Sequence, residues 1–505
     1  MSECGYACED CRGQGRIVKK SRKKRVSAPV ISNCDKCLGV GVIAGKCPEA
    51  SSPESASVDV DVAIVGCGIG GAALALALQQ RGISHAVFER DLDFKQRKQG
   101  YGLTMQQGSI ALARLGIAVT GTASLSHVSR LPNGEVLGCY GRELDDRREA
   151  LAEKGNSDAV IQSSHKTRHN IQIPRQRLRA MLVHRLNKVY WDHKFTKFES
   201  PNPNWVELHF ENHPTKVIKA SVVVGADGIF SPVTKQIRKN QDELVYLGVI
   251  VMLGICNAPG LTALHRRVTQ TLDGETRIFT MPFTSSGDPA EEVEIETAYF
   301  DQQRFRPQTD VVMWQLSFTC SEEFAIALGK QGGEALKLEA QRRLQGWHTP
   351  LPELVDLTDP MDITGYPTYD RDQMVFPSPE SQSRCTVLGD AAHCMSPFKG
   401  QGANQALVDA ISLARRLSTV FGPFATGENH VCQQLREFEA ELVTRAGEKV
   451  EASRIAAKYL HSKDALQVGN CVRSAASMSQ IERIANVSEQ EHELRRANAK
   501  RLLES

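Results

Sequence analysis

A glycine-rich turn between two apolar runs constrains this chain more than any other feature. Residues 62–65 are apolar and predict a buried strand, which leads into Gly66, Gly68 and Gly71, spaced as GxGxxG. Residues 72–81, rich in alanine and leucine, predict a helix directly after the turn. Strand, glycine turn and helix in this order are typical of a parallel sheet that binds a dinucleotide.

The glycines of such a turn have distinct tasks. Gly66 permits the tight bend, Gly68 allows backbone N–H groups to approach a pyrophosphate, and Gly71 allows the helix to pack closely on the strand. The N-terminus of the helix stabilises the phosphate charge. We therefore expect Gly66, Gly68, Ile69, Gly70 and Gly71 to contact a nucleotide.

An acidic residue completes the pattern. The second apolar run, residues 83–88, ends in Glu89 and Arg90, and both are expected to bind the cofactor. An acid about 20 residues beyond the glycines is placed for a ribose 2′-OH and disfavours a 2′-phosphate. The alternative, a glycine turn with only a packing role, is not favoured because strand, helix and acid are all in place. This stretch alone does not distinguish NAD from FAD.

Length and charge limit the classes of protein to consider. A chain of 505 residues predicts about two to four domains, and its net charge of +2 gives no global field that favours nucleic acid or a membrane. No apolar run reaches the ~18 residues of a transmembrane helix, and the N-terminus lacks the apolar core of a signal peptide. The expected location is cytoplasmic, with an organelle or the nucleus left open.

Residues 1–47 form a separate cysteine-rich module. They contain the sequence CxxCxGxG twice, with Cys8 and Cys11 in the first copy and Cys34 and Cys37 in the second. Two such pairs match a four-thiolate zinc site, and the alternative is a redox dithiol or unligated thiols. The pattern resembles half of the cysteine-rich zinc domain of DnaJ-type chaperones, but chaperone activity does not follow from about 40 residues. The module could also bind a protein partner.

The segments before and after the second cysteine repeat are predicted to have no binding role of their own. Residues 19–25 are almost all basic, and we favour a solvated hairpin arm over a nucleic-acid contact. Residues 48–57 are rich in serine, proline and glutamate and predict a linker.

The rest of the chain predicts an α/β fold with an inserted, mainly antiparallel sheet. Residues 58–239 and 376–420 are expected to form the two parts of the nucleotide-binding domain, and residues 240–375 a substrate domain of spaced, partly alternating strands. The polar residues 141–170 predict a surface flap. Residues 421–505 have helical periodicity and predict several helices that pack on the nucleotide-binding domain.

Three further segments carry candidate ligands. A buried strand ends in Asp227 and Gly228, and Arg175 lies where a strand turns into a helix. A third apolar strand ends in a loop that leads into a helix, and the helix N-terminus there would stabilise negative charge on a cofactor. The expected ligands of this loop are Gly389, Asp390, Pro397, Gly400, Gln401, Gly402 and Asn404.

Together these stretches resemble the three fingerprints of the FAD-dependent aromatic hydroxylases, single-component flavoprotein monooxygenases with the p-hydroxybenzoate hydroxylase fold. The resemblance covers about residues 58–415 and implies a tightly bound FAD, with Arg175 in contact with it. The sequence departs from the family at Thr234, followed by Lys235, where the family has an arginine linked to pyridine-nucleotide binding. The departure leaves the mode of NAD(P)H binding open.

The resemblance also implies a reaction. NAD(P)H binds transiently and reduces FAD, the reduced flavin and O₂ form a C4a-hydroperoxide, and this hydroxylates or epoxidises a small organic, most simply aromatic, substrate. The sequence identifies no catalytic side chain, although Arg277, Tyr366 and His265 are candidate bases. The alternatives are an FAD-dependent reductase of the same fold acting on a prenyl or polyene substrate, and an adaptor with a structural flavin whose zinc module is the working part.

Overall fold

The computed structural model describes most of the chain outside a few loops and both termini. The described residues are 5–19, 30–37, 39–43, 45, 53, 57–96, 101–117, 121–124, 126–140, 171–239, 244–261, 264, 267–283, 311–371, 383–426 and 430–467. The expected flap at 141–170, most of the basic stretch 19–25, His265 and the end of the chain from 468 lie outside the described residues.

The expected nucleotide-binding domain is built on a mixed six-stranded sheet. Four parallel strands form its centre because their sequences are almost entirely apolar and both of their faces are buried. A hairpin extends the sheet on one side. The strands are β12 (Phe195–Asn202), β13 (Trp205–Phe210), β14 (Ile218–Gly225), β5 (Val60–Val65) and β6 (His85–Phe88), with β20 (Cys385–Val387) paired to β14.

Helices cover this sheet and lead into the expected site. Helix α1 (Ile69–Gln79) is buried on nearly all sides because it lies among β5, β6 and other helices, which explains its run of alanine and leucine. It packs along α11 (Gly402–Leu417). The remaining helices of this domain are α2 (Gln107–Arg114), α4 (Arg175–Val183), α5 (Pro232–Ile237) and the short α10 (Asp390–His393).

A seven-stranded sheet forms the second domain, as the alternating strands of residues 240–375 predict. Its order is β10-β9-β16-β17-β18-β15-β19, with all pairs antiparallel except β9 and β16. The strands are β9 (Ser126–Arg130), β10 (Val136–Tyr140), β15 (Val245–Asn257), β16 (Arg267–Leu272), β17 (Thr276–Phe283), β18 (Val311–Thr319) and β19 (Ile363–Asp370).

The expected domain division needs one correction. Strands β9 and β10 come from the segment 58–239, yet they pair with β16 at the edge of the second sheet. Parallel pairing between β9 and β16 requires a long crossover, which no local pattern announces. The chain therefore enters the substrate domain twice.

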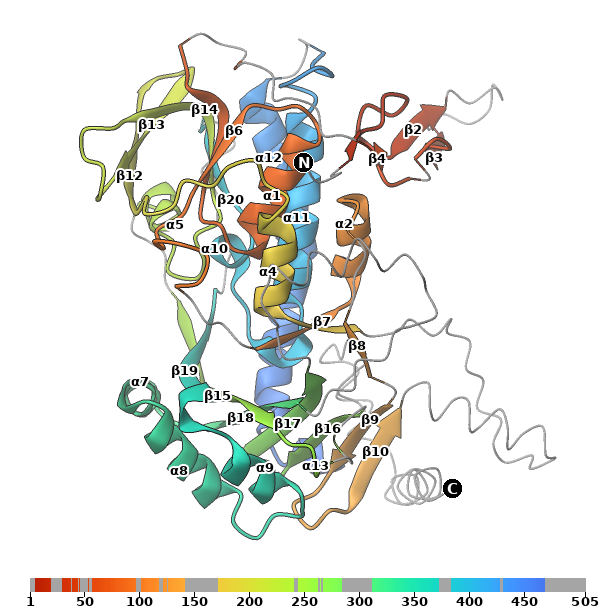
Figure 1. Cartoon of the computed structure of the whole chain (residues 1–505), viewed down its shortest axis with the longest axis vertical. Helices are drawn as coiled ribbons and strands as arrows, with labels where there is room; N and C mark the ends of the chain where they lie inside the picture. Colours follow the sequence, from red (N-terminus) through yellow and green to blue (C-terminus); the bar gives the residue numbers. More distant parts are fainter. Residues whose placement is uncertain are drawn as a thin grey trace, which may run out of the picture.

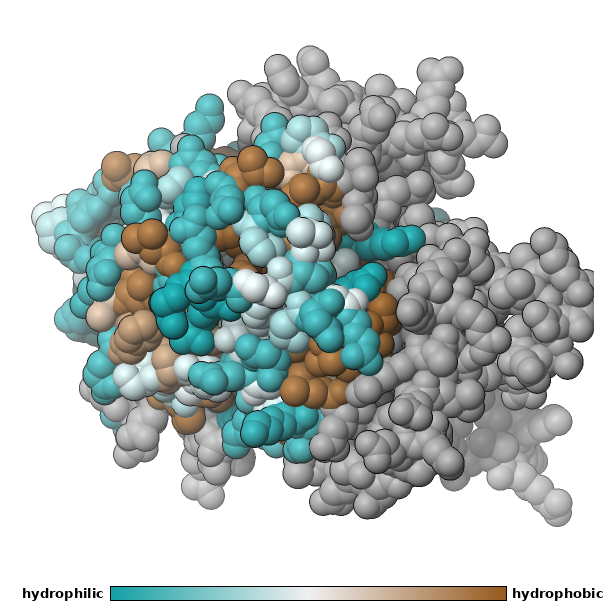
Figure 2. Space-filling model, turned by 90° about the horizontal axis from the view of Figure 1, so that it is seen from below, coloured by the Kyte–Doolittle hydropathy of each residue, from teal (hydrophilic) through white to brown (hydrophobic). Residues whose placement is uncertain are grey.

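One face of the second sheet is covered by helices and the other faces the first domain. The covering elements are α7 (Glu322–Gln331), α8 (Gly333–Arg343), α9 (Leu351–Leu357) and the 3₁₀ turn η3 (Pro360–Asp362). On the outer surface Leu338, Leu357 and Met361 are exposed by 66, 59 and 90%. The view from below shows apolar patches separated by polar side chains, as is ordinary for a protein surface (Figure 2).

The two domains are joined by a small sheet and one long helix. The small sheet consists of β7 (Gly102–Met105), β11 (Ile171–Pro174) and β8 (Thr122–Ala123). The described part of the C-terminal region forms the 30-residue α12 (Val431–Leu460) and the short α13 (Asp464–Gln467), and the expectation of further helices beyond residue 467 stays a prediction. Helix α12 contacts both α11 and β15 and so runs along both domains (Figure 1). Among the described helices, none has the length and apolar composition needed to cross a membrane.

The cysteine module lies beside the first domain (Figure 1). Strand β1 (Tyr6–Ala7) pairs with β4 (Val42–Ile43), and β2 (Arg16–Lys19) pairs with β3 (Val30–Asn33) in an antiparallel manner. The β2–β3 pair agrees with the expected hairpin arm between the two CxxC repeats.

Candidate functional site

The glycine turn after β5 leaves open space where a cofactor would lie. Gly66 has φ +101°, and a Cβ there would lie 2.5 Å from the carbonyl oxygen of Ala226; a Cβ on Gly71 would lie 2.0 Å from the oxygen of Gly66. Packing alone therefore requires both of these glycines. A Cβ on Gly68, in contrast, would meet none of the described atoms within 4 Å. The absence of a side chain at Gly68 keeps the N-terminus of α1 accessible.

The acid after β6 holds the same turn. The carboxylate of Glu89 accepts hydrogen bonds from the backbone N–H groups of Cys67 at 2.7 Å and Asp91 at 3.2 Å. Arg179, which the sequence did not single out, donates from Nε to the Cys67 oxygen at 2.8 Å and lies 4.0 Å from Glu89. The expected contact of Glu89 with a ribose stays a prediction, and Arg90 is exposed beside it.

Arg175 and Arg179 belong to one helix face. Arg175 begins α4, its guanidinium lies 5.6 Å from the centre of the Tyr101 ring, and Arg179 follows four residues later. Residues four apart in a helix lie on the same side, so this spacing could have identified Arg179 from the sequence. The expected FAD contact of Arg175 stays a prediction.

The loop after β14 carries a buried carboxylate oxygen without a partner. Asp227 Oδ2 accepts from the Val233 N–H at 3.3 Å, whereas Oδ1 is buried with no hydrogen-bond partner among the described residues. Burial raises the pKa of Asp227 to about 6. Gly228 has φ +84°, and a Cβ there would meet nothing in the described structure within 4 Å. An unpaired acceptor beside open space is what a hydroxyl-bearing ligand would satisfy.

The loop after β20 is fixed from beneath by a buried charged trio. Asp409 of α11 accepts hydrogen bonds from the Gly389 N–H at 2.9 Å and from His393 Nε2 at 2.6 Å, and it pairs with Arg445 of α12 at 2.7 Å. Although burial opposes protonation, Asp409 raises the pKa of His393. Asp390 itself is exposed at the start of α10, where it remains accessible to a ligand.

The side chain of Asn404 makes four hydrogen bonds within the protein. Its Oδ1 accepts from the N–H groups of Gln106 and Gly108, both at 2.8 Å, and its Nδ2 donates to the oxygens of Thr104 at 2.9 Å and Gly400 at 2.8 Å. Its side chain is fully used within the protein, where it positions the loop, and the expected cofactor contact of Asn404 stays a prediction.

The turn before α11 leaves the backbone N–H groups at the start of this helix without a capping side chain from the described residues. Pro397 begins the 3₁₀ turn η4 (Pro397–Lys399), and Gly400 follows in the left-handed region at φ +59°. Gln401 donates to Gln106 at 2.8 Å, and within the described residues no side chain caps the start of α11 at Gly402. The N-termini of α1 and α10 also lack side-chain caps in this part of the chain. Uncapped helix N-termini favour anionic groups of a ligand.

Arg371 joins two of these loops and was missed by sequence reasoning. It is only 1% exposed, and its two terminal nitrogens donate to the oxygens of Asp390 and Ile229, each at 2.7 Å. At the position of the family arginine, Thr234 donates its hydroxyl to the Ala391 oxygen at 2.7 Å. The chain therefore joins the same two loops with a threonine and a distant arginine.

The second sheet turns an apolar wall toward this region. The wall combines alternate residues of neighbouring strands, and the ring of Phe398 from η4 packs against it. Its buried members are Val251, Leu253, Val268, Met281, Phe283 and Met313, with Tyr101, Phe279 and Phe398 partly buried.

Polar groups follow this wall on the same face of the sheet. The Arg277 guanidinium stacks over the rings of Phe279 at 5.0 Å and Phe398 at 5.6 Å. Gln315, paired across the strands with Phe279, is 7% exposed, and its Nε2 has no hydrogen-bond partner among the described residues. Burial lowers the pKa of nearby His461 to about 4, so this ring is neutral at physiological pH.

Of the three candidate bases, the structure favours none. Arg277 is a permanently charged guanidinium and does not accept a proton. Burial, together with Tyr101 and Asp390, raises the pKa of Tyr366, which keeps its phenol protonated at neutral pH. His265 lies outside the described residues.

The residues present fit FAD: three loops converge, two glycines leave open space, and Asp227 offers an unpaired acceptor. The model of the family described as FAD binding domain matches residues 59–284 and 354–429. The chain belongs to this family.

Relatives with named activities support the same conclusion. The chain is 28% identical to the aurachin C monooxygenase/isomerase of Stigmatella aurantiaca, over 75% of this chain and 83% of the relative. It is 27% identical to the 6-hydroxynicotinate 3-monooxygenase of Pseudomonas fluorescens, over 48% of this chain and 55% of the relative. The solved structure of Klebsiella pneumoniae HpxO with FAD and uric acid superposes with a TM-score of 0.62 at 19% identity, covering 87% of this chain and 97% of that one. The expected activity is thereby confirmed: the chain is an FAD-dependent monooxygenase.

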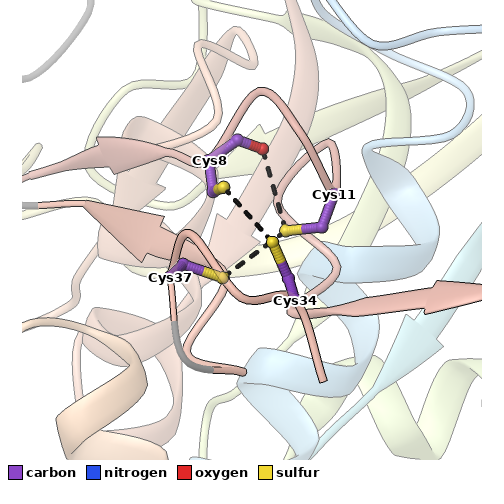
Figure 3. Close-up of side chains that lie close together, drawn as sticks. All are labelled: Cys8, Cys11, Cys34 and Cys37. Atoms are coloured by element: carbon purple, nitrogen blue, oxygen red, sulfur yellow. Dashed lines mark hydrogen bonds between the residues drawn. The ribbon is translucent and has the colours of Figure 1, made fainter. Parts of the chain in front are cut away.

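This monooxygenase carries a second cluster at its N-terminus. The sulfurs of Cys8, Cys11, Cys34 and Cys37 are buried and lie within 4.8 Å of one another (Figure 3). Cys8 and Cys34 are 3.8 Å apart, and Cys11 and Cys37 are 3.7 Å apart. Four sulfurs placed tetrahedrally at about 2.3 Å from a zinc ion would be separated by about 3.8 Å. The side chains are therefore arranged as a metal site requires.

The two CxxC repeats are related as near copies. The N–H of Gly15 points to Cys11 Sγ at 3.1 Å, and that of Gly41 points to Cys37 Sγ at 3.2 Å. Gly13, Gly15, Gly39 and Gly41 all have positive φ between 73° and 89°, which explains the glycines of the repeat.

Proposed function

We propose that this enzyme uses NAD(P)H and O₂ to hydroxylate a flat aromatic substrate that carries an oxygen acceptor on its ring. The observation that carries the proposal is the buried, unpartnered Nε2 of Gln315 beside the apolar wall. A donor buried without a partner is costly, so a bound acceptor would stabilise it.

The apolar wall and the polar groups of Gln315 and Arg277 would bind different parts of the substrate. Met281, Phe283 and Met313 exclude water and offer a surface to a flat ring. The Gln315 amide and the Arg277 guanidinium supply a hydrogen-bond donor and a positive charge for a carbonyl or phenolate oxygen. The 6-hydroxynicotinate named for one relative has this chemistry, a hydroxylated aromatic ring containing nitrogen.

The cofactor would be held by the three loops. Gly68, beside which the structure leaves open space, would contact the cofactor together with Asp227 and Asp390, and the N-terminus of α11 would stabilise negative charge on the reduced cofactor. FAD, when bound, accepts electrons from reduced nicotinamide and activates dioxygen. Glu89, Arg90 and Arg175 complete the proposed contacts with the nucleotide.

A substrate screen tests the proposed activity. The purified yellow protein is mixed with NADH or NADPH and with hydroxypyridines, hydroxyquinolines, phenols and isoprenoids, and both oxidation of the nicotinamide and hydrogen peroxide are followed. We expect stimulated oxidation and an oxygenated product with a hydroxylated ring. Reduction of a polyene without oxygen uptake would instead support a reductase, and a colourless protein that takes up no FAD would contradict the proposal.

Gln315→Leu tests the donor directly. Because leucine cannot hydrogen-bond, we expect the KM for the oxygen-bearing substrate to rise about 10- to 100-fold. The FAD content should be unchanged. Gln341→Leu, on the outer helix α8, is the matched control and should leave KM unchanged. An unchanged KM in Gln315→Leu would assign the amide a purely structural role.

We also propose that Cys8, Cys11, Cys34 and Cys37 bind one zinc ion. The sulfur separations and the donated N–H groups support four-thiolate coordination over a redox dithiol. Metal analysis of the full-length protein should find one zinc per chain, and Cys34→Ser should remove it. A protein free of zinc and containing disulfides between these residues would overturn this assignment.

We propose a cytoplasmic location for the enzyme. Ten cysteines of the described residues are free of disulfides, as in a reducing compartment. Cell fractionation with an antibody to the chain tests the location. Co-purification through the cysteine module, compared with a chain lacking residues 1–57, tests whether the module binds a protein partner.

A further inference from the structure

The cysteine module is docked on the C-terminal ends of two helices that begin at the cofactor site. The Ala7 N–H donates to the oxygen of Gln80, which follows α1, at 2.8 Å. Gln14 donates to the Arg415 oxygen of α11 at 2.8 Å and to Ser418 at 3.1 Å. The contacts come from the first CxxC repeat and the strand before it.

Two arginines of the first domain lie beneath that repeat. Arg81 is 1% exposed and donates from Nη2 to the Gly13 oxygen at 2.8 Å, while its Nε is buried without a hydrogen-bond partner in the described structure. Arg415 likewise has Nε and Nη2 buried and without partners among these residues. Buried, incompletely bonded guanidinium groups are costly unless negative charge lies nearby.

The surroundings of Arg415 increase this cost. Burial, followed by the charges of Arg114, Arg81 and Arg16, lowers the pKa of Arg415 to about 9, and Cys11 is the neighbour that raises it. Burial also lowers the pKa of Arg81 to about 10, again opposed by Cys11. Because the first repeat packs directly against both guanidinium groups, its thiolates would supply the nearby negative charge.

The glycines of the first repeat permit the close approach. A Cβ on Gly13 would lie 3.3 Å from Arg81 Nε, and a Cβ on Gly15 would lie 2.3 Å from the Gly39 oxygen and 3.0 Å from Arg415 Nη2. The corresponding glycines of the second repeat, Gly39 and Gly41, would meet Asn33 and Gly13 instead. Among the described neighbours of these four glycines, the guanidinium groups therefore lie against the first repeat.

We propose that Arg81 and Arg415 are the counter-ions of a zinc tetrathiolate, so that metal binding holds the module on α1 and α11. The proposal rests on the zinc site proposed above. Four thiolates and one Zn²⁺ carry a net charge of −2, which two guanidinium groups balance. The same helices begin at Ile69 and Gly402 beside the cofactor loops, so the metal stabilises the cofactor-binding domain.

Charge variants of Arg415 test the counter-ion role in the full-length protein. Transfer of zinc to the chelator 4-(2-pyridylazo)resorcinol is followed in wild type, Arg415→Gln, Arg415→Lys and Arg416→Gln. We expect Arg415→Gln to release zinc roughly tenfold faster, because one balancing charge is lost. Arg415→Lys should stay close to wild type. Arg416 is one residue away and pairs with Glu437 instead, so Arg416→Gln is the matched control.

The outcomes separate this proposal from the zinc site itself. If the purified wild-type protein contains no zinc, both the zinc site and the counter-ion role of the arginines are contradicted. Wild type with zinc, together with an unchanged release rate in Arg415→Gln, would leave the zinc site standing and overturn the counter-ion role. Wild type stripped of zinc gives a second measurement that does not depend on a variant folding. Its thermal midpoint should fall and its FAD should dissociate faster, and an unchanged midpoint and FAD retention would contradict the proposal.

Discussion

Arg371 is the side chain on which the geometry of the two cofactor loops depends most directly. It bridges the Asp390 and Ile229 oxygens from a buried position after β19. Nothing in the local sequence marks it, because its partners lie about 20 and 140 residues away. Asn404 shows the converse: its motif predicts a cofactor ligand, but only the structure reveals that all four of its hydrogen bonds are internal.

Arg371→Met should destabilise the protein and release FAD. Methionine fills much of the space but leaves both carbonyl oxygens without their donor, which costs about 2–4 kcal/mol in the free energy of unfolding. Urea unfolding and the flavin content after gel filtration measure the two effects. Arg384→Met is the control, since Arg384 also donates to backbone oxygens, Pro203 and Ser221, away from the cofactor. Equal losses of FAD in both variants would contradict a specific role for Arg371.

At the scale of elements, the trio of His393, Asp409 and Arg445 fastens α10, α11 and α12 together. The pKa of His393 is raised by Asp409 against the effect of burial. A raised folded-state pKa means that the pair's stabilisation is complete below the ordinary histidine pKa of about 6.5 and is lost as pH rises through the folded value.

His393→Gln should therefore have a pH-dependent effect on stability. Glutamine can still donate to Asp409 but carries no charge, so we expect a loss of about 1–2 kcal/mol at pH 6 that shrinks toward pH 9. Thermal unfolding of both proteins across this range measures the difference. A difference independent of pH would show that the pKa of His393 is the same in the folded and unfolded protein, which would contradict the raised folded-state pKa.

Local sequence patterns predicted the individual strands and helices of this fold better than they predicted which of these elements pack against one another. The apolar run before Gly66 and the alanine- and leucine-rich segment after it predicted β5 and α1, and spaced strands predicted β15 to β18. The pairing of β9 with β16 was not predictable in this way, because it joins segments about 140 residues apart. The cysteine spacing predicted a four-sulfur cluster, but Arg81 and Arg415 beneath it are brought there only by α1 and α11.

At the scale of the whole molecule, α12 is the element that holds the two domains in one arrangement. Ser396 before η4 donates to the Ser453 oxygen at 2.8 Å, and Arg454 makes two hydrogen bonds to Asp370, at 2.8 and 3.0 Å. Asp370 is fully buried at the end of β19, directly before Arg371. The pair therefore connects the long helix, the second sheet and the arginine that bridges the cofactor loops.

A double-mutant cycle on Asp370 and Arg454 tests this connection. Arg454→Met leaves a buried carboxylate unpaired and should cost about 3–5 kcal/mol, whereas Asp370→Asn with Arg454→Met should recover part of that loss. Chemical unfolding gives the coupling energy, expected at about 1–3 kcal/mol. Flavin fluorescence in the same samples reports how firmly FAD is held. We expect weaker FAD binding in the Arg454→Met variant and a partial recovery of FAD binding in the double variant. Additive losses without coupling would mean that the two domains keep their arrangement independently of this pair.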